Sequence, residues 1–401
     1  MGLKRYKLGD LIEVTRGQSL AGEFYAEEGK YIRLTLGNFD YANGGFKPNT
    51  TKTNLYYTGP IKEQFILEEG DIITPLTEQT PGLLGSTARI PISGTYIQSQ
   101  DVALVRCKDG MIDPAFCYYL LPSSSVKKQL AAGAQQTKIR HTSPDKIKDV
   151  VVDIPDISEQ RRIGQLLDAI THKIELNRSI NQNLEALAKQ LYDYWFVQFD
   201  FPNENGQPYK SNGGKMVWNE YLKREIPKDW FVANYKELFT IGNGKTMPQI
   251  YGVFPAYGGN GKVKDVGESN YGPCIIIGRV GANCGSIHYS KVPCWVSDNA
   301  IAVCPIIDSW QPYLYYSLKL FNLAKNKGGS SQPLITHMTL KNLYFPISKE
   351  IVEKYACIAN CLQNLIYSNQ IEIIQLTKQR DKLLPLLMNG QVSLNSDLSN
   401  D

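Results

Sequence analysis

The fold is decided by the stretch Glu159-Gln-Arg-Arg-Ile-Gly-Gln-Leu-Leu-Asp-Ala-Ile-Thr-His-Lys-Ile-Glu-Leu-Asn-Arg178. Its apolar residues recur by alternating steps of four and three, which is the spacing of a coiled-coil seam. Asp156 or Ser158 can cap the start, and Glu159 lies three residues after Asp156, as in a capping box. The pattern predicts one long helix within residues 156–199. Its seam comprises Ile163, Leu167, Ile170, Ile174, Asn177, Asn181, Leu184, Ala188, Leu191 and Trp195.

A second seam with the same spacing lies near the C-terminus, within residues 348–391. Ser348 is the expected cap and Asn389-Gly390 the expected stop, while Pro385 should kink or fray the last turn. The two helices together predict an antiparallel coiled coil. The second seam comprises Ala359, Leu362, Ile366, Asn369, Ile373, Leu376, Arg380, Leu383 and Leu387.

Asn177 and Asn369 occupy matching places near the middle of the two helices. If the helices pair antiparallel, matched midpoints meet, so the two amides are expected to hydrogen-bond to each other and to specify the register. The alternative is that both asparagines are solvated edge positions. On the first interpretation, replacing Asn177 by leucine would raise thermal stability.

The segments that precede the two helices also repeat one another. Tyr96-Ile-Gln-Ser-Gln-Asp101 is echoed by Cys294-Trp-Val-Ser-Asp-Asn299, and Gly133-Ala-Gln-Gln-Thr-Lys-Ile139 by Gly329-Ser-Ser-Gln-Pro-Leu-Ile335. A duplicated globular segment with its own helix indicates two similar binding surfaces. The predicted class is α+β, with two pseudo-symmetric mixed α/β heads separated by the helices. The expected segments are head 1 (1–155), a central spacer helix (156–199), a connector (200–230), head 2 (231–347), a C-terminal spacer helix (348–391) and a flexible tail (392–401).

Within the heads, short alternating apolar runs predict strands, for example over 31–34, 71–74 and 101–105. Short helices are expected over 114–121 and 123–132. Glycine clusters at 257–261 and 277–281 predict tight turns or a close backbone approach.

The overall composition fits a globular chain of two domains: 401 residues, 42% apolar and 20% charged, with a net charge of +4. The N-terminal residues lack the apolar core of a signal peptide, and no apolar run approaches the roughly 20 residues of a membrane span. These features favour a cytoplasmic location. The charge is mild for a protein that grips nucleic acid alone, so a DNA reader of this kind would need a partner to share the grip.

Motifs for common catalytic sites are missing from the chain. There is no Pro-Pro dipeptide, as an adenine methyltransferase loop requires, and Gly242-Asn-Gly-Lys-Thr246 lacks the earlier glycine of a phosphate-binding loop. The eight cysteines form no Cys-x-x-Cys pair, so buried free thiols are expected rather than a metal site. His141 and His337 recur at similar places in the repeats, which suggests a structural role. The chain therefore resembles a binding protein with no cofactor and no metal of its own.

Polar side chains in and near the glycine-rich turns are candidates for contacts with DNA. Arginine and lysine can bind guanine edges, and asparagine and glutamine can bind adenine edges. For each candidate the alternative is a solvated loop or a turn-capping side chain. The candidates in head 1 are Arg16, Gln18, Gln79, Gln135, Gln136, Lys138 and Arg140, and those in head 2 are Lys245, Tyr257, Asn260, Lys262, Arg279, Asn283 and Gln332.

Several of these motifs together resemble the specificity subunit of type I restriction-modification systems. They are Glu159-Gln-Arg-Arg-Ile163, Asp168-Ala-Ile-Thr-His-Lys-Ile-Glu-Leu-Asn-Arg178, Pro208-Tyr-Lys-Ser-Asn-Gly-Gly-Lys-Met216 and Leu383-Leu-Pro-Leu-Leu-Met-Asn-Gly-Gln391. The likeness covers essentially the whole chain. Lys354-Tyr-Ala356 departs from it, because it stands where the first helix has Arg-Arg-Ile.

The resemblance implies a subunit without catalytic activity whose two heads are target recognition domains. Each head would read one half of a bipartite, asymmetric DNA site, and the helices would set the gap. The subunit would dock two modification subunits, which bind S-adenosylmethionine, and two restriction subunits, which use ATP and Mg²⁺. An adhesion or scaffold protein and a self-contained methyltransferase remain the alternatives. Co-purification with a methyltransferase partner would separate them.

Overall fold

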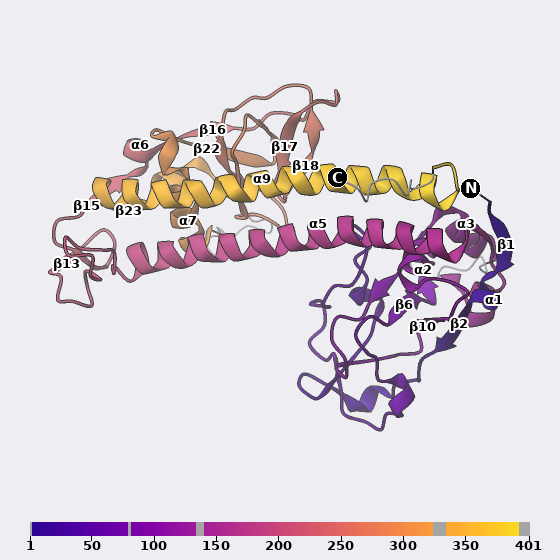
Figure 1. Ribbon diagram of the computed structural model, residues 1–401. Helices are drawn as coiled ribbons and strands as arrows, with labels where there is room; N and C mark the ends of the chain where they lie inside the picture. Colours follow the sequence, from indigo (N-terminus) through magenta and orange to yellow (C-terminus); the bar gives the residue numbers. More distant parts are fainter. Residues whose placement is uncertain (1, 79–81, 134–139, 324–333, 393–401) are drawn as a thin grey trace. The chain divides into compact units, whose positions relative to one another are not determined.

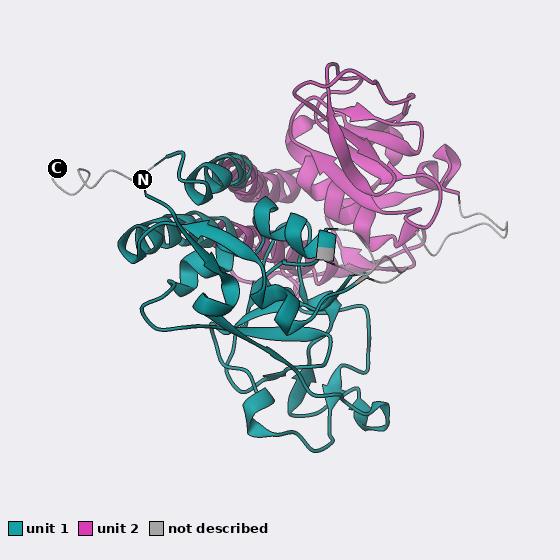
Figure 2. Cartoon of the chain, turned by 90° about the vertical axis from the view of Figure 1, so that its right-hand side faces the viewer, with its two compact units in different colours: residues 1–175, 373–401 teal, residues 176–372 magenta. Residues whose placement is uncertain are grey.

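The computed structural model describes residues 2–78, 82–133, 140–323 and 334–392. These residues form two compact units, coloured separately in Figure 2. Unit 1 comprises residues 1–175 and 373–401, and unit 2 comprises residues 176–372. Each unit therefore contains one globular head and a segment of both long helices.

Unit 1 is built around two four-stranded sheets, in the orders β2-β10-β6-β8 and β3-β5-β4-β9. The pairs β1-β12 and β7-β11 complete it. Two adjoining apolar clusters form its core. Its strands are β1 (Lys4–Lys7), β2 (Ile12–Arg16), β3 (Tyr25–Ala26), β4 (Tyr31–Arg33), β5 (Tyr56–Tyr57), β6 (Ile72–Pro75), β7 (Thr77–Glu78), β8 (Ala88–Arg89), β9 (Tyr96–Ile97), β10 (Val102–Cys107), β11 (Arg140–His141) and β12 (Val151–Ile154). Its short helices are α1 (Leu8–Leu11), η1 (Gly22–Phe24), η2 (Leu36–Asn38), η3 (Glu63–Phe65), α2 (Pro114–Leu120), α3 (Ser124–Gly133) and α4 (Pro144–Lys148).

Unit 2 holds a four-stranded sheet, β16-β22-β19-β20, a three-stranded sheet, β18-β17-β21, and the pairs β15-β23 and β13-β14. Its strands are β13 (Met216–Asn219), β14 (Arg224–Pro227), β15 (Phe231–Asn234), β16 (Phe239–Asn243), β17 (Phe254–Gly258), β18 (Gly261–Val266), β19 (Cys274–Gly278), β20 (Ile287–Ser290), β21 (Trp295–Val296), β22 (Ala300–Pro305) and β23 (Tyr344–Ile347). Its short helices are α6 (Tyr235–Leu238), η5 (Asp308–Trp310), α7 (Gln311–Leu320) and α8 (His337–Lys341).

The sheets of the two units match one another, which confirms the duplication inferred from the sequence. The order β2-β10-β6-β8 in unit 1 corresponds to β16-β22-β19-β20 in unit 2. In both units a strand pair, β1-β12 or β15-β23, joins the start of the head to the strand just before the long helix. The α+β class is therefore confirmed. The strands predicted over 31–34, 71–74 and 101–105 correspond to β4, β6 and β10, and the two predicted short helices to α2 and α3.

The two long helices are α5 (Ile157–Tyr192) and α9 (Lys349–Met388), and both begin and end close to the predicted signals (Figure 1). Asp156 caps α5, because its Oδ1 accepts hydrogen bonds from the backbone N–H groups of Ser158 and Glu159, each at 3.0 Å. A single π-helical turn, η4 (Asp193–Val197), follows α5. After α9, Gly390 adopts a φ of 65°, as a helix-terminating glycine does. The helix continues through Pro385 to its end.

Every predicted seam residue of both helices is buried or half-buried. In unit 2 the α5 and α9 segments run antiparallel: Asn369 Nδ2 donates to Asn181 Oδ1 at 2.9 Å, and the rings of Trp195 and Tyr355 lie 6.2 Å apart. In unit 1, Ile163 of α5 and Leu387 of α9 share one apolar cluster. The coiled-coil seam is therefore confirmed within each unit.

The expected hydrogen bond between Asn177 and Asn369 is wrong. Asn177 is 2% exposed, and its Nδ2 donates to Glu372 Oε2 at 2.7 Å, while Asn369 bonds to Asn181. Reversing one helix reverses the order of its steps of three and four. Along α5 the seam residue after Asn177 is Asn181, four positions on. Along α9 in the opposite direction, the seam residue after Asn369 is Ile366, only three positions away. The two residues therefore cannot occupy the same layer, whereas Asn181 and Asn369 can.

Each head binds to the long helices through hydrogen bonds to residues beside the seam. In unit 1, Asp168 of α5 accepts hydrogen bonds from Arg89 Nη1 at 2.8 Å and from the Tyr119 hydroxyl at 2.9 Å. In unit 2, Lys291 Nζ donates to Asn360 Oδ1 of α9 at 2.7 Å. Asp168 and Asn360 occupy matching places in the two helices. The position on the helix that holds the head is therefore duplicated together with the head.

The prediction of buried thiols holds for only part of the cysteines. All eight are free, and Cys117, Cys274, Cys284 and Cys294 are buried, but Cys357 and Cys361 on α9 are exposed. Their four-residue spacing places them on one outer side of α9, away from its seam. In the described part of the chain, no helix is both long and apolar enough to span a membrane.

Candidate nucleic-acid interface

A glycine turn in each head brings a polar residue against a serine in the short segment between two strands, β9 and β10 in unit 1 and β21 and β22 in unit 2. Gln18 in unit 1 forms a parallel bridge with Ser99, and Lys245 in unit 2 forms the same bridge with Ser297. The preceding residue is glycine in both cases, because a Cβ at Gly17 would lie 2.3 Å from the Ser99 carbonyl oxygen. In unit 2, a Cβ added at Gly244 would lie 1.7 Å from the Ser297 carbonyl oxygen. These turns therefore require a residue without a side chain.

In head 2 the segment 297–299 holds three glycine-rich turns together. The backbone N–H of Ser297 donates to the Tyr257 carbonyl at 2.9 Å, and that of Asp298 to the Lys245 carbonyl at 3.1 Å. Arg279 N–H donates in turn to the Asn299 carbonyl at 2.9 Å. The turns that carry the sequence candidates are therefore neighbours in the fold, although they are spread over the chain from Lys245 to Asn283.

Most described head 2 candidates face solvent within this cluster. Lys245, Asn260, Lys262 and Asn283 are exposed, and Arg279 is half-buried. Lys262 Nζ lies 2.7 Å from Asp265 Oδ1, so part of its charge is neutralised within the hairpin. The Arg279 guanidinium has no ion-pair partner among the described residues. Arg279 is thus the better placed of the two to meet a phosphate or a base edge.

Tyr257 differs from the other head 2 candidates because it packs inward. Its ring lies against the buried cluster that contains Cys274 and Ile276. Burial raises the pKa of the Tyr257 hydroxyl above its ordinary value. The structure therefore gives Tyr257 a place in the support of the turns rather than at their outer surface.

In head 1 the corresponding segment, 99–101, organises the described candidates. Arg16 Nε donates to the Gln100 carbonyl at 2.8 Å, which leaves the outer nitrogens of an exposed guanidinium available. Gln18 Nε2 donates to the Pro60 carbonyl at 3.1 Å, while its buried Oε1 has no partner. Leu76 N–H donates to the Asp101 carbonyl at 2.8 Å, so β7 follows directly beside this segment.

Four head 1 candidates and one head 2 candidate lie outside the described residues. They are Gln79, Gln135, Gln136, Lys138 and Gln332. Arg140 lies in β11, where its backbone pairs with Glu78 of β7. Leu76, just before β7, donates to the Asp101 carbonyl. The β7-β11 pair that contains Arg140 therefore continues from segment 99–101.

Sequence reasoning missed Arg33, which lies in β4 and lines a cavity of about 360 Å³ beside segment 99–101. Arg33 is only 7% exposed. The selection of candidates from glycine-rich turns passed over it because its neighbours, Ile32 and Leu34, are typical of a strand. A cation between apolar residues of a predicted strand was the signal that could have found it.

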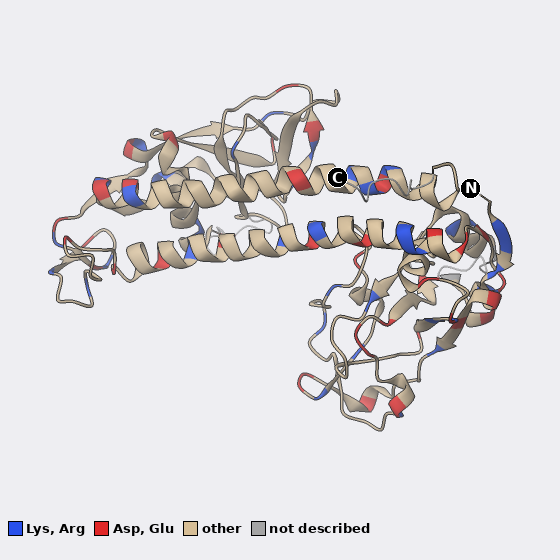
Figure 3. Ribbon diagram, viewed as in Figure 1, with Lys and Arg blue, Asp and Glu red and all other residues tan. Residues whose placement is uncertain are grey.

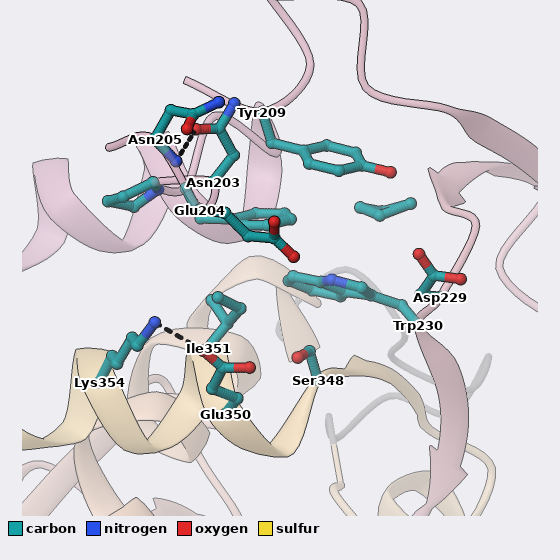
Figure 4. A pocket seen from close by; sticks show the side chains of 13 residues that line it. Asn203, Glu204, Asn205, Tyr209, Asp229, Trp230, Ser348, Glu350, Ile351 and Lys354 are labelled. Atoms are coloured by element: carbon teal, nitrogen blue, oxygen red, sulfur yellow. Dashed lines mark hydrogen bonds and ion pairs between the residues drawn. The ribbon is translucent and has the colours of Figure 1, made fainter. Parts of the chain in front are cut away.

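The connector packs against head 2, because Phe201 and Trp230 belong to the apolar cluster of that head. The rings of Phe201 and Tyr209 stack with centroids 4.7 Å apart, and Phe201 stacks on Trp230 at 5.1 Å. Beside Trp230 lies a cavity of about 390 Å³, bordered by the first turn of α9 (Figure 4). Glu350 and Lys354 on its helical wall form an ion pair at 2.6 Å. Three acidic side chains and one cation, Lys354, are among the residues that line it, so the cavity does not resemble a DNA-binding site.

A second surface lies on the flank of the unit 2 coiled coil. Five exposed apolar residues each stand one position before a residue of the seam: Ile180, Leu187, Tyr194, Ile358 and Leu365. They share one heptad position, and in an antiparallel pair such positions fall on the same flank. Head 2 contacts the other flank, where Tyr316 donates to the Glu185 carbonyl and the Tyr192 hydroxyl lies 2.9 Å from Ser317 Oγ. We call these five residues the apolar flank.

The apolar flank is also poor in charge. Between Lys354 and Glu372, α9 has no acidic or basic residue, as its long uncoloured stretch in Figure 3 shows. Leu187 is 50% and Leu365 is 54% exposed. Exposed apolar residues in a row without charges are typical of a protein interface.

A family model described as "Type I restriction modification DNA specificity domain" matches residues 2–186 and 227–380. The chain belongs to this family. The two matched ranges cover both heads and most of both long helices, in agreement with the duplication.

Individual members of the family are distant in sequence. The MjaIX specificity subunit of Methanocaldococcus jannaschii is 25% identical over 352 residues, which are 78% of either chain. The HindI specificity subunit of Haemophilus influenzae is 29% identical over 107 residues, 26% of this chain and 23% of that one. The crystal structure of a type I restriction-modification S subunit from M. genitalium superposes with a TM-score of 0.65 at 20% identity, covering 96% of both chains. This similarity supports the fold described above.

Proposed function

We propose that the chain is the DNA-recognition subunit of a type I restriction-modification complex and has no catalytic activity or cofactor of its own. Each head reads one half of a bipartite, asymmetric site. The observation that carries this proposal is a turn that both heads share. Each head holds a glycine followed by a polar residue against a serine between two strands, but the polar residue is Gln18 in one head and Lys245 in the other. The same backbone arrangement with different side chains suits the recognition of two different DNA sequences.

The long helices act as the spacer between the half-sites. At 1.5 Å per residue, α5 with 36 residues and α9 with 40 residues are each roughly 55 to 60 Å long. One turn of B-DNA is about 34 to 36 Å. Two short blocks separated by an unread gap are therefore the expected form of the site.

Two modification subunits dock on the helices, and they supply the S-adenosylmethionine-dependent methylation. The apolar flank supports this, because its row of leucine, isoleucine and tyrosine suits helices of another chain. Two restriction subunits, with ATP and Mg²⁺, would complete the nuclease. The modification subunits share the contacts with DNA phosphates, which agrees with a net charge of only +4. The complex works in the cytoplasm.

The test is co-expression of the chain with a modification subunit, followed by mapping of methylated adenines. A bipartite motif with a fixed gap is expected. Exchanging residues 1–155 for another head should change one half-site only. One continuous motif, or methylation by this chain alone, would refute the proposal.

Docking has its own test in the substitution Leu187→Glu or Leu365→Glu. Either charge on the apolar flank should reduce co-purification of the modification subunit. Asn183→Glu serves as the control, since Asn183 is exposed on α5 outside the flank. Equal recovery with all three variants would refute this docking surface.

A further inference from the structure

Arg33 is a buried cation without an acidic partner. It lies on β4 with 7% of its surface exposed, and no carboxylate forms an ion pair with it among the described residues. Burial of an arginine is costly unless its charge is compensated. Asp101 is the one acidic residue that lines the adjoining cavity, and it is not within ion-pair distance of Arg33. The charge therefore lacks a counterpart within the described protein.

The Arg33 side chain is nevertheless held in one orientation. Its Nε and Nη2 donate to the Asn54 carbonyl at 3.3 and 3.1 Å. Its guanidinium plane also lies over the Tyr25 ring, with Cζ 3.8 Å from the centroid. Of the five N–H groups of an arginine, the two on Nη1 have no acceptor in the described part of the chain. The Nη1 N–H groups of Arg33 are therefore available to donate to an acceptor on a bound molecule.

The cavity beside Arg33 has further donors and one more cation. It holds about 360 Å³, and Thr51, Asn49 and the exposed Lys52 are among its lining residues. Lys52 has no ion-pair partner among the described residues. Ser99 and Gln100 also line the cavity, and they belong to the segment that organises the head 1 candidates. The cavity therefore opens beside the candidate DNA-binding turns.

We propose that this cavity binds a phosphate group of the DNA backbone through Arg33 and Lys52. A guanine edge is less suitable, because a side chain must project into the major groove to reach it, and Arg33 is enclosed. A backbone phosphate protrudes from the duplex and can enter a cavity. The two N–H groups on Nη1 can each donate to a phosphate oxygen, and Lys52 adds a second positive charge beside them. This inference rests on the proposed function, and it assigns Arg33 to positioning the duplex rather than to reading its sequence.

The site belongs to head 1 alone. In β4, Arg33 pairs in parallel with Ile97, and in β17 the residue that pairs with the matching Trp295 is Ala256. Ala256 is fully buried and has no polar side chain. The two heads therefore share the turn cluster but not this phosphate contact.

The experiment measures the affinity of the complex of this chain with its modification subunits for a duplex that carries the methylated motif, between 50 and 200 mM salt. Each phosphate contact contributes a slope of roughly 0.9 in log K against log salt for B-DNA. Arg33→Gln should reduce the slope by about one and weaken binding tenfold or more at low salt. Lys52→Gln should reduce the slope in the same direction. The methylated motif should be unchanged in both variants.

Two further variants complete the test. Arg33→Lys keeps the charge but loses the planar fork, so it should weaken binding with little change of slope. Lys148→Gln, at a half-buried lysine of the same head that pairs with Asp145 at 2.8 Å, should leave both quantities unchanged. Because Lys52 is exposed, Lys52→Gln remains decisive even if Arg33→Gln does not fold.

An unchanged slope for Lys52→Gln and for folded Arg33→Gln would overturn the phosphate site, and a changed half-site would assign Arg33 to base reading instead. Failure of the proposed function would look different, since the unmodified complex would then neither bind nor methylate a bipartite site.

Discussion

Replacing Asn177 by leucine should lower the stability of unit 2, although the buried position alone suggests the opposite. Asn177 is 2% exposed, and its Nδ2 donates to the Glu372 carboxylate at 2.7 Å. A hydrogen bond to a charged group contributes about 1.5–3 kcal/mol. Leucine would recover about 1 kcal/mol through apolar burial. The difference is about 0.5–2 kcal/mol, and the 2.7 Å length of this hydrogen bond favours the upper part of the range, so the free energy of unfolding should fall by about 1–2 kcal/mol.

Thermal unfolding of the variant measures this loss. For a unit of about 200 residues, 1–2 kcal/mol corresponds to a decrease in Tm of roughly 2–8 °C. Asn183→Leu is the matched control, because Asn183 is exposed on the same helix. A Tm for Asn177→Leu at or above that of the control would refute the reasoning.

Four other substitutions test the packing of the heads and helices. Gln363 is 2% exposed and both polar atoms of its amide lack a partner, so Gln363→Leu should raise the free energy of unfolding by about 1–2 kcal/mol in urea titration; a decrease would imply a partner such as bound water. Gly244→Ala should disturb head 2 alone, so that methylation falls while the head 1 half-site stays the same, and normal activity would contradict the close backbone approach. Asp168→Asn should destabilise unit 1 by about 1 kcal/mol, because Arg89 loses its ion pair, and Tyr119→Phe should cost less; the reverse order in thermal melts would contradict the structure.

The helices were the most predictable part of the fold. A step pattern of fours and threes needs only local information, and Asp156 and Gly390 mark the ends of α5 and α9 as capping principles expect. The short strands of the heads were also predictable where β-branched residues gather, as in β6. The pairing of those strands was not, because it joins residues far apart in the chain.

The candidate interface was predictable in part for the same reason. Glycine-rich turns indicated where the backbone approaches another segment, and the structure brings those of head 2 together. The segment that joins them, 297–299, was visible only as a repeated motif. Arg33 escaped notice because its meaning depends on burial and on Tyr25, and neither follows from the residues beside it.

The two central asparagines retain a role in register, but with different partners. Asn181 and Asn369 share a layer of unit 2, and Asn177 meets Glu372 close by. A slip of one heptad would set the Asn181 amide against Leu362 and leave it without a hydrogen bond. An unpaired buried amide costs more than a made hydrogen bond contributes, so the wrong register is penalised more strongly than the right one is stabilised. Register specificity of this kind follows from the polar pairs themselves and does not require the two copies of the helix to meet residue for residue.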